Sequence, residues 1–425
     1  MSYKASRFNC IKKGEKVAIC NTFSGSMAVL EQSEYAKLQQ INNYSTTDSD
    51  VQKWLEQGFI VEVDKDEVAI TNFCRYRDSF LRNRPIYRIL TTSACNARCF
   101  YCYEKGRPIQ TMNQETAIQV GNFIMKRTKD NTRVTLNWFG GEPLLNPDVI
   151  TLITKNIAAS TNIKFRSTII TNASLFTLKL INLAKEVWNL NNVQITLDGL
   201  EENHERRKAY VNSGMTFSRT IGHISLLLTT GIHVTLRLNY DKDNYNDIIK
   251  LIYFIKNTFG DTPNLSCYAY PLFNTIHSKG YSYIAKGEIS KYEARLKDVL
   301  FECGYYNPLK ILSRRTYSCF ATDPYSFVIN TDGLLYKCTM DMSDTSRAVG
   351  NVQDGVNINN PLTEWTTPIL PSKCEKCKLL PICQGGCRFG QLFNIEMNDC
   401  AIKKQALEYT LNNLLIINIK CHENH

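Results

Sequence analysis

Three cysteines in the first quarter of the chain have a spacing that is typical of metal binding. Cys95, Cys99 and Cys102 form the pattern Cys-x3-Cys-x2-Cys. Three thiolates on one loop can hold three irons of a 4Fe-4S cluster and leave the fourth iron open to another ligand. The alternative is a zinc loop that takes its fourth ligand from elsewhere in the chain. The spacing therefore predicts a metal site and leaves open whether it holds a cluster or a zinc ion.

Eight of the sixteen cysteines lie in the last quarter or so of the chain, and seven of them, all but Cys421, form a spaced set. The seven are Cys319, Cys338, Cys374, Cys377, Cys383, Cys387 and Cys400. Part of this set fits a zinc ribbon or treble clef, where Cys-x2-Cys is common. The first twenty residues contain no apolar run of signal-peptide length, so we expect a cytoplasmic protein. Because the cytoplasm is reducing, the cysteine count indicates metal or cluster binding and not a disulfide framework.

The middle of the chain predicts an α/β fold that would position the first three cysteines. Six β-rich runs alternate with helical patterns, at 86–91, 134–139, 165–171, 193–197, 234–239 and 265–270. This alternation predicts a parallel sheet, open or curled into a partial barrel. In such sheets ligands bind at the carboxyl ends of the strands. The loop that begins at Cys95 follows the first run, so we expect the metal site at this edge.

Two further segments flank this α/β domain, which we expect to span residues 85–300. Residues 1–84 predict a small α+β unit, with short strands at 7–11, 16–21, 26–30 and 59–63 and helices at 33–40 and 48–57. This order of elements resembles a winged-helix module. Residues 301–425 have a looser pattern and hold the late cysteines. The sequence therefore predicts three domains.

The charge of the chain does not indicate a nucleic-acid partner. The net charge is +10, and the segment 85–318 holds +11 of it, against +1 for 1–84 and −2 for 319–425. A nucleic-acid arm would show a basic run at a terminus or a dense Lys/Arg stripe, and neither is present. The surplus fits a solvated basic surface or a central domain that holds anionic ligands. No run of about 20 apolar residues is present, so we expect no membrane span.

The cysteine triplet, with Tyr101 just before its third member, resembles the signature of radical S-adenosylmethionine enzymes. Motifs at four later strand ends resemble the same family. They are Gly140-Gly141-Glu142-Pro143, Thr171-Asn172-Ala173, Asp198-Gly199, and Arg237 with Asn239. The resemblance implies a partial (β/α)6 TIM-like barrel whose open iron binds S-adenosylmethionine. It also implies that the Gly-Gly-Glu-Pro segment meets the amino group of the cofactor, that Thr171 and Asn172 lie near its ribose and carboxylate, and that Tyr101 lies near its adenine.

Two departures from the family pattern concern the grip on the cofactor carboxylate. Ala173 replaces the expected Gly, and Lys208 stands where relatives often have an Arg. The expectation is that Arg207 or Lys208 takes this role, although a Lys does not reproduce the bidentate geometry of an Arg.

The late cysteines resemble the SPASM extension of the same enzymes, which holds two auxiliary clusters. The resemblance assigns Cys374, Cys377, Cys383 and Cys400 to an outer cluster, and Cys319, Cys338 and Cys387 to an inner one. The inner set has three ligands. Sulfatase-maturing relatives add a Cys before Cys338 and an Asp directly after it, and both are absent here. Cys267, Cys303 and Cys421 are candidates for a fourth ligand, but we expect each to be a buried free thiol.

The resemblance implies a cytoplasmic radical S-adenosylmethionine/SPASM peptide maturase with three 4Fe-4S clusters. A 5′-deoxyadenosyl radical would take a hydrogen from a ribosomally made precursor peptide, and an intramolecular C–C or C–S crosslink would follow. The N-terminal module would bind the leader as an added strand. A flavodoxin- or ferredoxin-type donor would supply the electron. Alternatives are a sulfatase-type or quinone-cofactor maturase, a non-catalytic iron–sulfur carrier and a zinc protein; for the N-terminal module, the alternative is a stabilising cap. No residue stands out as a general base.

Overall fold

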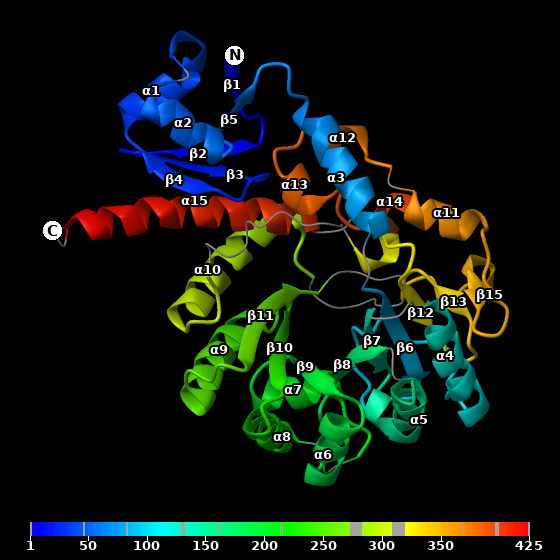
Figure 1. Ribbon diagram of the computed structural model, residues 1–425. Helices are drawn as coiled ribbons and strands as arrows, with labels where there is room; N and C mark the ends of the chain where they lie inside the picture. The colour runs from blue at the N-terminus through cyan, green and yellow to red at the C-terminus, as the bar shows by residue number, and fades with distance from the viewer. Residues whose placement is uncertain are drawn as a thin grey trace.

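The computed structural model describes residues 2–423, apart from 46, 82–83, 129–131, 161–162, 213, 215, 273–282, 308–318, 368 and 396–398. Three regions follow one another along the chain in Figure 1: a small N-terminal α+β region, a large sheet covered by helices, and a C-terminal region of short elements that ends in a long helix. Among the described helices, none is long and apolar enough to pass through a membrane.

The centre of the molecule is an eight-stranded sheet in the order β11-β10-β9-β8-β7-β6-β12-β13. Its six consecutive parallel strands are β6 (Ile86–Thr92), β7 (Arg133–Gly140), β8 (Lys164–Thr171), β9 (Leu190–Leu197), β10 (His233–Tyr240) and β11 (Leu265–Pro271). The prediction of an α/β fold with a parallel sheet is confirmed. Figure 1 shows the strands arranged in an arc, with helices around its outside.

The helices of this region lie between the strands in sequence. They are α4 (Gln114–Arg127), α5 (Pro147–Ala158), α6 (Leu178–Glu186), α7 (Glu201–Lys208), α8 (Phe217–Thr229), α9 (Tyr245–Phe259) and α10 (Ile289–Glu302). Several begin at a side-chain cap: Asn113, Thr177 and Thr216 each accept a hydrogen bond from a backbone N–H of the first helical turn. Alternate strand residues and one face of each of these helices except α7 form a single large apolar core, which fixes the strand register.

The C-terminal region extends the same sheet. Strand β12 (Phe327–Ile329) pairs parallel to β6, and β13 (Leu335–Tyr336) pairs antiparallel to β12. The other described elements are β14 (Gly350–Asn351), β15 (Gly355–Val356), α11 (Asn360–Thr366), α12 (Ser372–Glu375), α13 (Leu380–Cys383), α14 (Arg388–Leu392) and α15 (Asp399–Glu423). The last helix is 25 residues long and contacts both α10 and the N-terminal strands.

The N-terminal region contains two small antiparallel sheets and three helices. Strand β1 (Tyr3–Ala5) pairs with β5 (Ile60–Glu62), and β2 (Asn9–Lys13), β3 (Val17–Asn21) and β4 (Met27–Leu30) form the second sheet. The helices are α1 (Gln32–Gln39), α2 (Ser49–Glu56) and α3 (Glu67–Leu81). The order of strands and helices expected from the sequence is present, with β1 and α3 added. The winged-helix comparison stays a prediction.

Candidate functional site

Glu142 joins the carboxyl ends of two neighbouring strands, β7 and β8. Its fully buried carboxylate accepts hydrogen bonds from Thr171 Oγ1 at 2.7 Å, from the backbone N–H of Asn172 at 2.8 Å and from that of Leu144 at 3.1 Å. Burial raises the pKa of Glu142, although the three hydrogen bonds favour its charged form. The Gly-Gly-Glu-Pro and Thr-Asn-Ala motifs, which lie about 30 residues apart in sequence, therefore meet at one edge of the sheet.

The two glycines before Glu142 allow this edge to approach the first strand closely. A Cβ at Gly140 would lie 2.2 Å from the carbonyl oxygen of Thr92, and a Cβ at Gly141 would lie 2.2 Å from that of Ala94. The backbone N–H of Gly141 donates to Thr92 O at 3.0 Å, and that of Glu142 donates to Ala94 O at 2.8 Å. Because no side chain fits between them, these glycines fix the start of the cysteine loop against β7.

The loop with Cys95, Cys99 and Cys102 follows β6 at this edge of the sheet. Backbone hydrogen bonds tie it to the end of α7: Arg98 N–H donates to Lys208 O at 2.8 Å, and Val211 N–H donates to the carbonyl of Asn96 at 2.9 Å. Burial raises the pKa of the Cys95 thiol to about 12 and that of Cys102 to about 11, and it also raises the pKa of Cys99. These thiols are kept protonated in the bare protein, so thiolate binding to a metal would release protons.

Asn96 is a site residue that the sequence reasoning missed. It lies between Cys95 and Cys99 in sequence, and its side chain donates to Ser174 Oγ at 2.8 Å and accepts from Asn172 Nδ2 at 2.8 Å. It thereby connects the cysteine loop to the end of β8. A buried Asn inside a metal loop is the signal that could have identified it, but its partners are almost 80 residues away in sequence.

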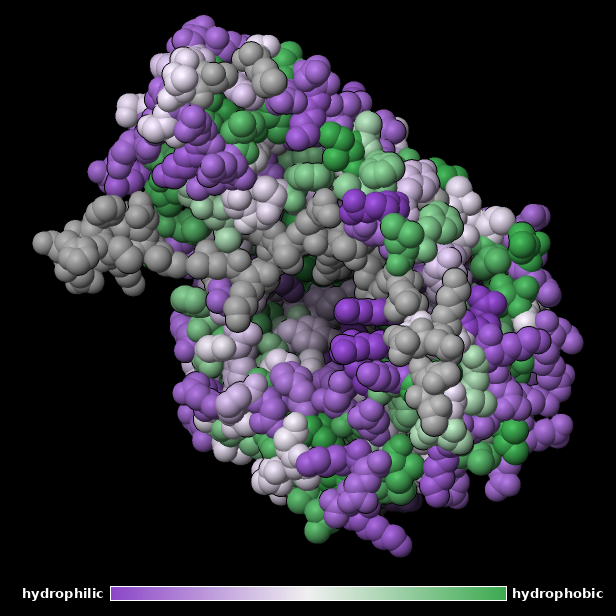
Figure 2. Space-filling model, in the orientation of Figure 1, coloured by the Kyte–Doolittle hydropathy of each residue, from purple (hydrophilic) through white to green (hydrophobic). Residues whose placement is uncertain are grey.

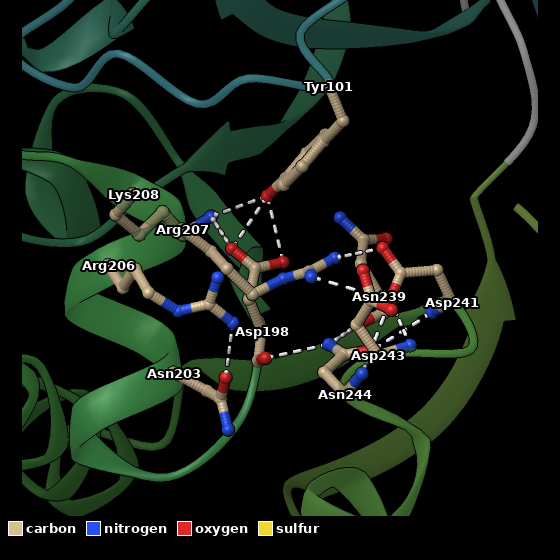
Figure 3. A network of polar contacts seen from close by, with 10 residues as sticks. All are labelled: Tyr101, Asp198, Asn203, Arg206, Arg207, Lys208, Asn239, Asp241, Asp243 and Asn244. Atoms are coloured by element: carbon tan, nitrogen blue, oxygen red, sulfur yellow. Dashed lines mark hydrogen bonds and ion pairs between the residues drawn. The ribbon is translucent and has the colours of Figure 1, made fainter. Parts of the chain in front are cut away.

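The half-buried Tyr101 and the buried Asp198 and Lys208 form a polar group beside the loop (Figure 3). The Tyr101 hydroxyl lies 2.6 and 2.8 Å from the two carboxylate oxygens of Asp198. Lys208 Nζ lies 3.2 Å from Asp198 Oδ2 and donates to the Tyr101 hydroxyl at 3.3 Å. Burial alone would raise the pKa of Asp198, but Lys208 holds it below its ordinary value. Burial opposes the charged form of Lys208, yet Asp198 raises its pKa well above the ordinary value.

Arg207 points to a different carboxylate from its neighbour Lys208. Its guanidinium lies 2.8 and 3.4 Å from the two carboxylate oxygens of Asp241, and both side chains are buried. The ring of Phe100 lies 4.9 Å from the guanidinium carbon. Of the two cations predicted to hold the cofactor carboxylate, Lys208 is thus the one that contacts Tyr101 and Asp198. The assignment of either residue to the cofactor stays a prediction.

The ends of β9 and β10 are joined by a second amide that the sequence reasoning missed. Asn244 Nδ2 donates to the carbonyls of Asp198, at 2.8 Å, and Asn239, at 2.9 Å. The predicted site residue Arg237 donates from Nε to Asn239 Oδ1 at 2.9 Å. Each predicted motif after a strand therefore lies at the same edge of the sheet as the cysteine loop.

The three cysteines assigned to an inner cluster lie near one another. Burial raises the pKa of the Cys338 thiol to about 12, and the proximity of Cys319 and Cys387 contributes to the rise. All three pack beside the apolar cluster that includes Phe320, Trp365 and Phe389. Arg107, on the first cysteine loop, donates to the carbonyl of Thr339 at 3.0 Å. This contact joins the two cysteine-bearing regions.

The four cysteines assigned to an outer cluster also lie near one another. Burial raises the pKa of Cys374, and Cys383, Cys377 and Cys400 add to the rise. The segment that carries them touches the N-terminal region: Arg7 donates to Glu375 O at 2.7 Å, and Lys378 Nζ donates to Asn9 O at 2.9 Å.

Two of the candidates for a fourth inner ligand lie elsewhere. Cys267 and Cys303 are buried in the core of the central sheet, where burial raises the pKa of Cys267 beyond its usual range and Cys303 adds to it. This agrees with the expectation of buried free thiols. The side chain of the third candidate, Cys421, lies outside the described residues.

The donor set suits iron–sulfur clusters and is also compatible with zinc. Thiolate ligands favour Fe–S clusters and zinc, and the first loop and the outer group are composed of thiols. In the part of the chain that the structure describes, no three His, Cys, Asp or Glu side chains converge on one ion position.

Comparisons with known proteins agree with this arrangement. Residues 89–255 match the family described as the Radical SAM superfamily. The radical SAM cyclopropyl synthase TigE of Paramaledivibacter caminithermalis is 23% identical over 419 residues, which cover 87% of this chain and 84% of TigE.

Two solved structures have similar folds. One is native anSMEcpe with bound AdoMet and the Cp18Cys peptide, with a TM-score of 0.62 and 18% identity over 78% of this chain and 99% of that one. The other is Streptococcus suis SuiB bound to the precursor peptide SuiA, with a TM-score of 0.54 and 15% identity over 93% of this chain and 98% of that one. The domain at residues 89–255, whose motifs gather at one edge of the sheet, is therefore similar to the Radical SAM superfamily.

Proposed function

We propose that this radical SAM enzyme is a peptide maturase that forms an intramolecular C–C or C–S crosslink in a ribosomally made precursor. The observation that carries the proposal is the meeting of the three-cysteine loop, the Gly-Gly-Glu segment and the polar group of Tyr101 at one edge of a parallel sheet. The relatives support the substrate class, because two of the similar structures contain a bound peptide and TigE is named a cyclopropyl synthase.

Different residues would bind the cluster and orient S-adenosylmethionine. Cys95, Cys99 and Cys102 would hold the cluster, and Glu142 and the carbonyls beside it would orient the cofactor's amino group. Bound together, the cluster and S-adenosylmethionine supply a 5′-deoxyadenosyl radical that removes a substrate hydrogen. Lys208, held by Asp198, would present a fixed positive charge to the cofactor carboxylate. The burial of Asp198 and Lys208 excludes water from this part of the site, and the exclusion of water protects a radical from side reactions.

The C-terminal cysteines would hold two auxiliary clusters that accept the surplus electron, within a SPASM domain at 301–425. The donor of the first electron would be a flavodoxin- or ferredoxin-type protein in the cytoplasm. A sulfatase-maturase substrate is the second candidate, because one relative is named a cysteine-type anaerobic sulfatase-maturating enzyme. The sequence weighs against it, since the Cys and Asp that such enzymes add around Cys338 are absent.

Residues 1–84 would recognise the leader of the precursor. A groove of about 280 Å³ supports this role, and it lies in the N-terminal region. Its walls include the consecutive residues of β5, Ile60, Val61 and Glu62, together with Phe23 and Leu55. Strand β5 pairs only with β1 among the described strands, so an edge remains on which an extended peptide can add.

Replacement of the cysteine triplet tests the main proposal. We expect the variant with Cys95, Cys99 and Cys102 changed to Ala to form no 5′-deoxyadenosine with dithionite under argon. It should retain the iron of the two auxiliary clusters. The control is the Cys267→Ser variant, which should keep full iron and full cleavage. Cofactor cleavage by the triple variant would refute the site, and a colourless wild type with zinc and no sulfide would refute the function.

A truncation tests the recognition module. A chain that begins at residue 85 should keep its clusters and lose binding of the precursor's leader peptide. Unchanged binding by a folded truncation, with native iron content, would favour a stabilising cap instead.

A further inference from the structure

Helix α3 has its polar residues buried and its aromatic residues exposed, which is the reverse of the usual arrangement on a surface helix. Glu67, Thr71, Arg75 and Ser79 recur every four residues and are all buried. On the opposite side, large apolar side chains face solvent. They are Phe73, Tyr76, Phe80 and Leu81, exposed by 64%, 43%, 51% and 73%. We call these four residues the aromatic stripe.

The buried polar face of α3 is accounted for by contacts inside the protein. The carboxylate of Glu67 accepts from Ser6 Oγ at 2.5 Å and from the backbone N–H of Arg7 at 2.9 Å. Arg75 and Ser79 line a small cavity together with Gln384 and Arg388 of the C-terminal region. The polar side of the helix therefore serves to pack α3 against the rest of the protein. These contacts do not explain why the aromatic stripe on the other side is exposed.

The stripe is continuous with the groove of the N-terminal region. Ile70 lines that groove and precedes Phe73 by three residues, so the two side chains are neighbours along one side of the helix. Helix α3 ends at Leu81, and strand β6 begins at Ile86. Figure 2 shows hydrophobic side chains gathered over α3, on the same view in which Figure 1 places α3 between the N-terminal strands and the sheet.

The size of the stripe fits a short segment better than a second copy of the chain. At about 200 Å² for a large side chain, the four residues leave roughly 450 Å² open to solvent. A stable interface between folded proteins buries about 800 Å² on each partner. An apolar peptide segment that lies along one helix face needs no more than the stripe offers.

We propose that the aromatic stripe of α3 binds an apolar segment of the precursor peptide, downstream of the part held in the groove. This inference rests on the proposed function and adds a second contact surface for the same peptide. The stripe binds the part of the precursor that runs from the leader module to the domain that begins with β6. Two contact surfaces joined by one short chain raise the affinity above that of either alone.

The test is a pair of matched double variants. Phe73→Ser with Phe80→Ser removes the centre of the stripe, and Ile118→Ser with Leu178→Ser removes equally exposed apolar residues from α4 and α6. The probe is the fluorescein-labelled precursor peptide, to be sought among the short reading frames that neighbour the gene, and its binding is measured by anisotropy with the cluster-loaded enzyme. We expect the stripe variant to raise the Kd at least tenfold and the control to change it less than twofold. Both should keep native iron content.

The possible outcomes separate the two proposals. If wild type does not bind the peptide, the leader function fails and this inference fails with it. If wild type binds and the stripe variant binds equally well, only the stripe is refuted. The remaining alternative is that the stripe binds a second copy of the chain, and sedimentation velocity tests it. A wild-type dimer that becomes a monomer in the stripe variant would assign the surface to a second copy and overturn the proposal.

Discussion

Gly141 offers a sharp test of how the sheet edge holds the cysteine loop. In a Gly141→Ala variant the new Cβ would lie 2.2 Å from Ala94 O, 2.5 Å from Ala94 C and 2.6 Å from Ser93 O. Ordinary contacts begin near 3.4 Å, so the backbone before Cys95 must retreat by about 1 Å. All three obstacles are backbone atoms, so no flexible side chain can rotate away.

The cost follows from the clash and from the bonds that it breaks. Overpacking of a tight interior costs about 1–3 kcal/mol. The hydrogen bond from Glu142 N–H to Ala94 O, at 2.8 Å, would be stretched, which adds about 1 kcal/mol. We therefore expect a loss of about 2–4 kcal/mol in stability. A displacement of about 1 Å at a reacting group can cost about 100-fold in rate.

Two assays and one control decide the outcome. Thermal unfolding under nitrogen reports the stability, and 5′-deoxyadenosine formation per bound iron reports the site. The control is Gly222→Ala on α8, where a Cβ meets nothing within 4 Å. Removing a helical glycine should stabilise that variant by about 0.5–1 kcal/mol. A Gly141→Ala enzyme within twofold of the wild-type rate and as stable as the control would refute the close-approach argument.

Three further outcomes follow from the site. Lys208→Met should destabilise the protein by about 3–5 kcal/mol, because it leaves Asp198 buried without its cation, and adding Asp198→Asn should recover part of the loss in urea titrations. Burial lowers the pKa of His204 to about 3, so the unfolded chain binds the proton first. The stability that neutral His204 contributes is complete above pH 6.5 and falls as the pH drops toward 3. Between pH 7 and 5, wild type should lose about 2 kcal/mol of unfolding free energy relative to His204→Asn. Equal slopes of unfolding free energy against pH in the two proteins would contradict this. Cys303→Ser should keep the iron-to-protein ratio of wild type, whereas Cys374→Ala should lower it; an iron loss in the first would return Cys303 to the ligand set.

The sheet could be predicted from the sequence because its strands are bounded by clear signals. All six parallel strands were located to within three residues, since each is a β-rich run, and five of them end at one of the Cys, Gly, Asn or Asp motifs. Helix α3 was not predicted. A search for buried apolar faces finds none there, because the residues that the fold buries are Glu67, Thr71, Arg75 and Ser79.

The contacts inside the site could not be predicted from the sequence for a different reason. Motif order placed Tyr101, Arg207 and Lys208 at the correct edge, but their partners depend on long-range packing. Arg207 is directed to Asp241, and Tyr101 reaches Asp198, almost a hundred residues away. No local pattern distinguishes which of two adjacent cations faces which carboxylate.

The position of α15 has a consequence for how the protein is made. Its residues Leu407 and Leu411 complete the apolar cluster under Cys10, Ala18 and Cys20 of the first sheet. At 5–20 residues per second, a ribosome needs roughly 20–80 s between Cys20 and Leu411. The segment around Cys20 thus waits for a segment almost 400 residues later in the chain before its packing is finished. We expect nascent chains to expose this cluster throughout synthesis, which makes the N-terminal region a client for chaperones that hold unfinished chains.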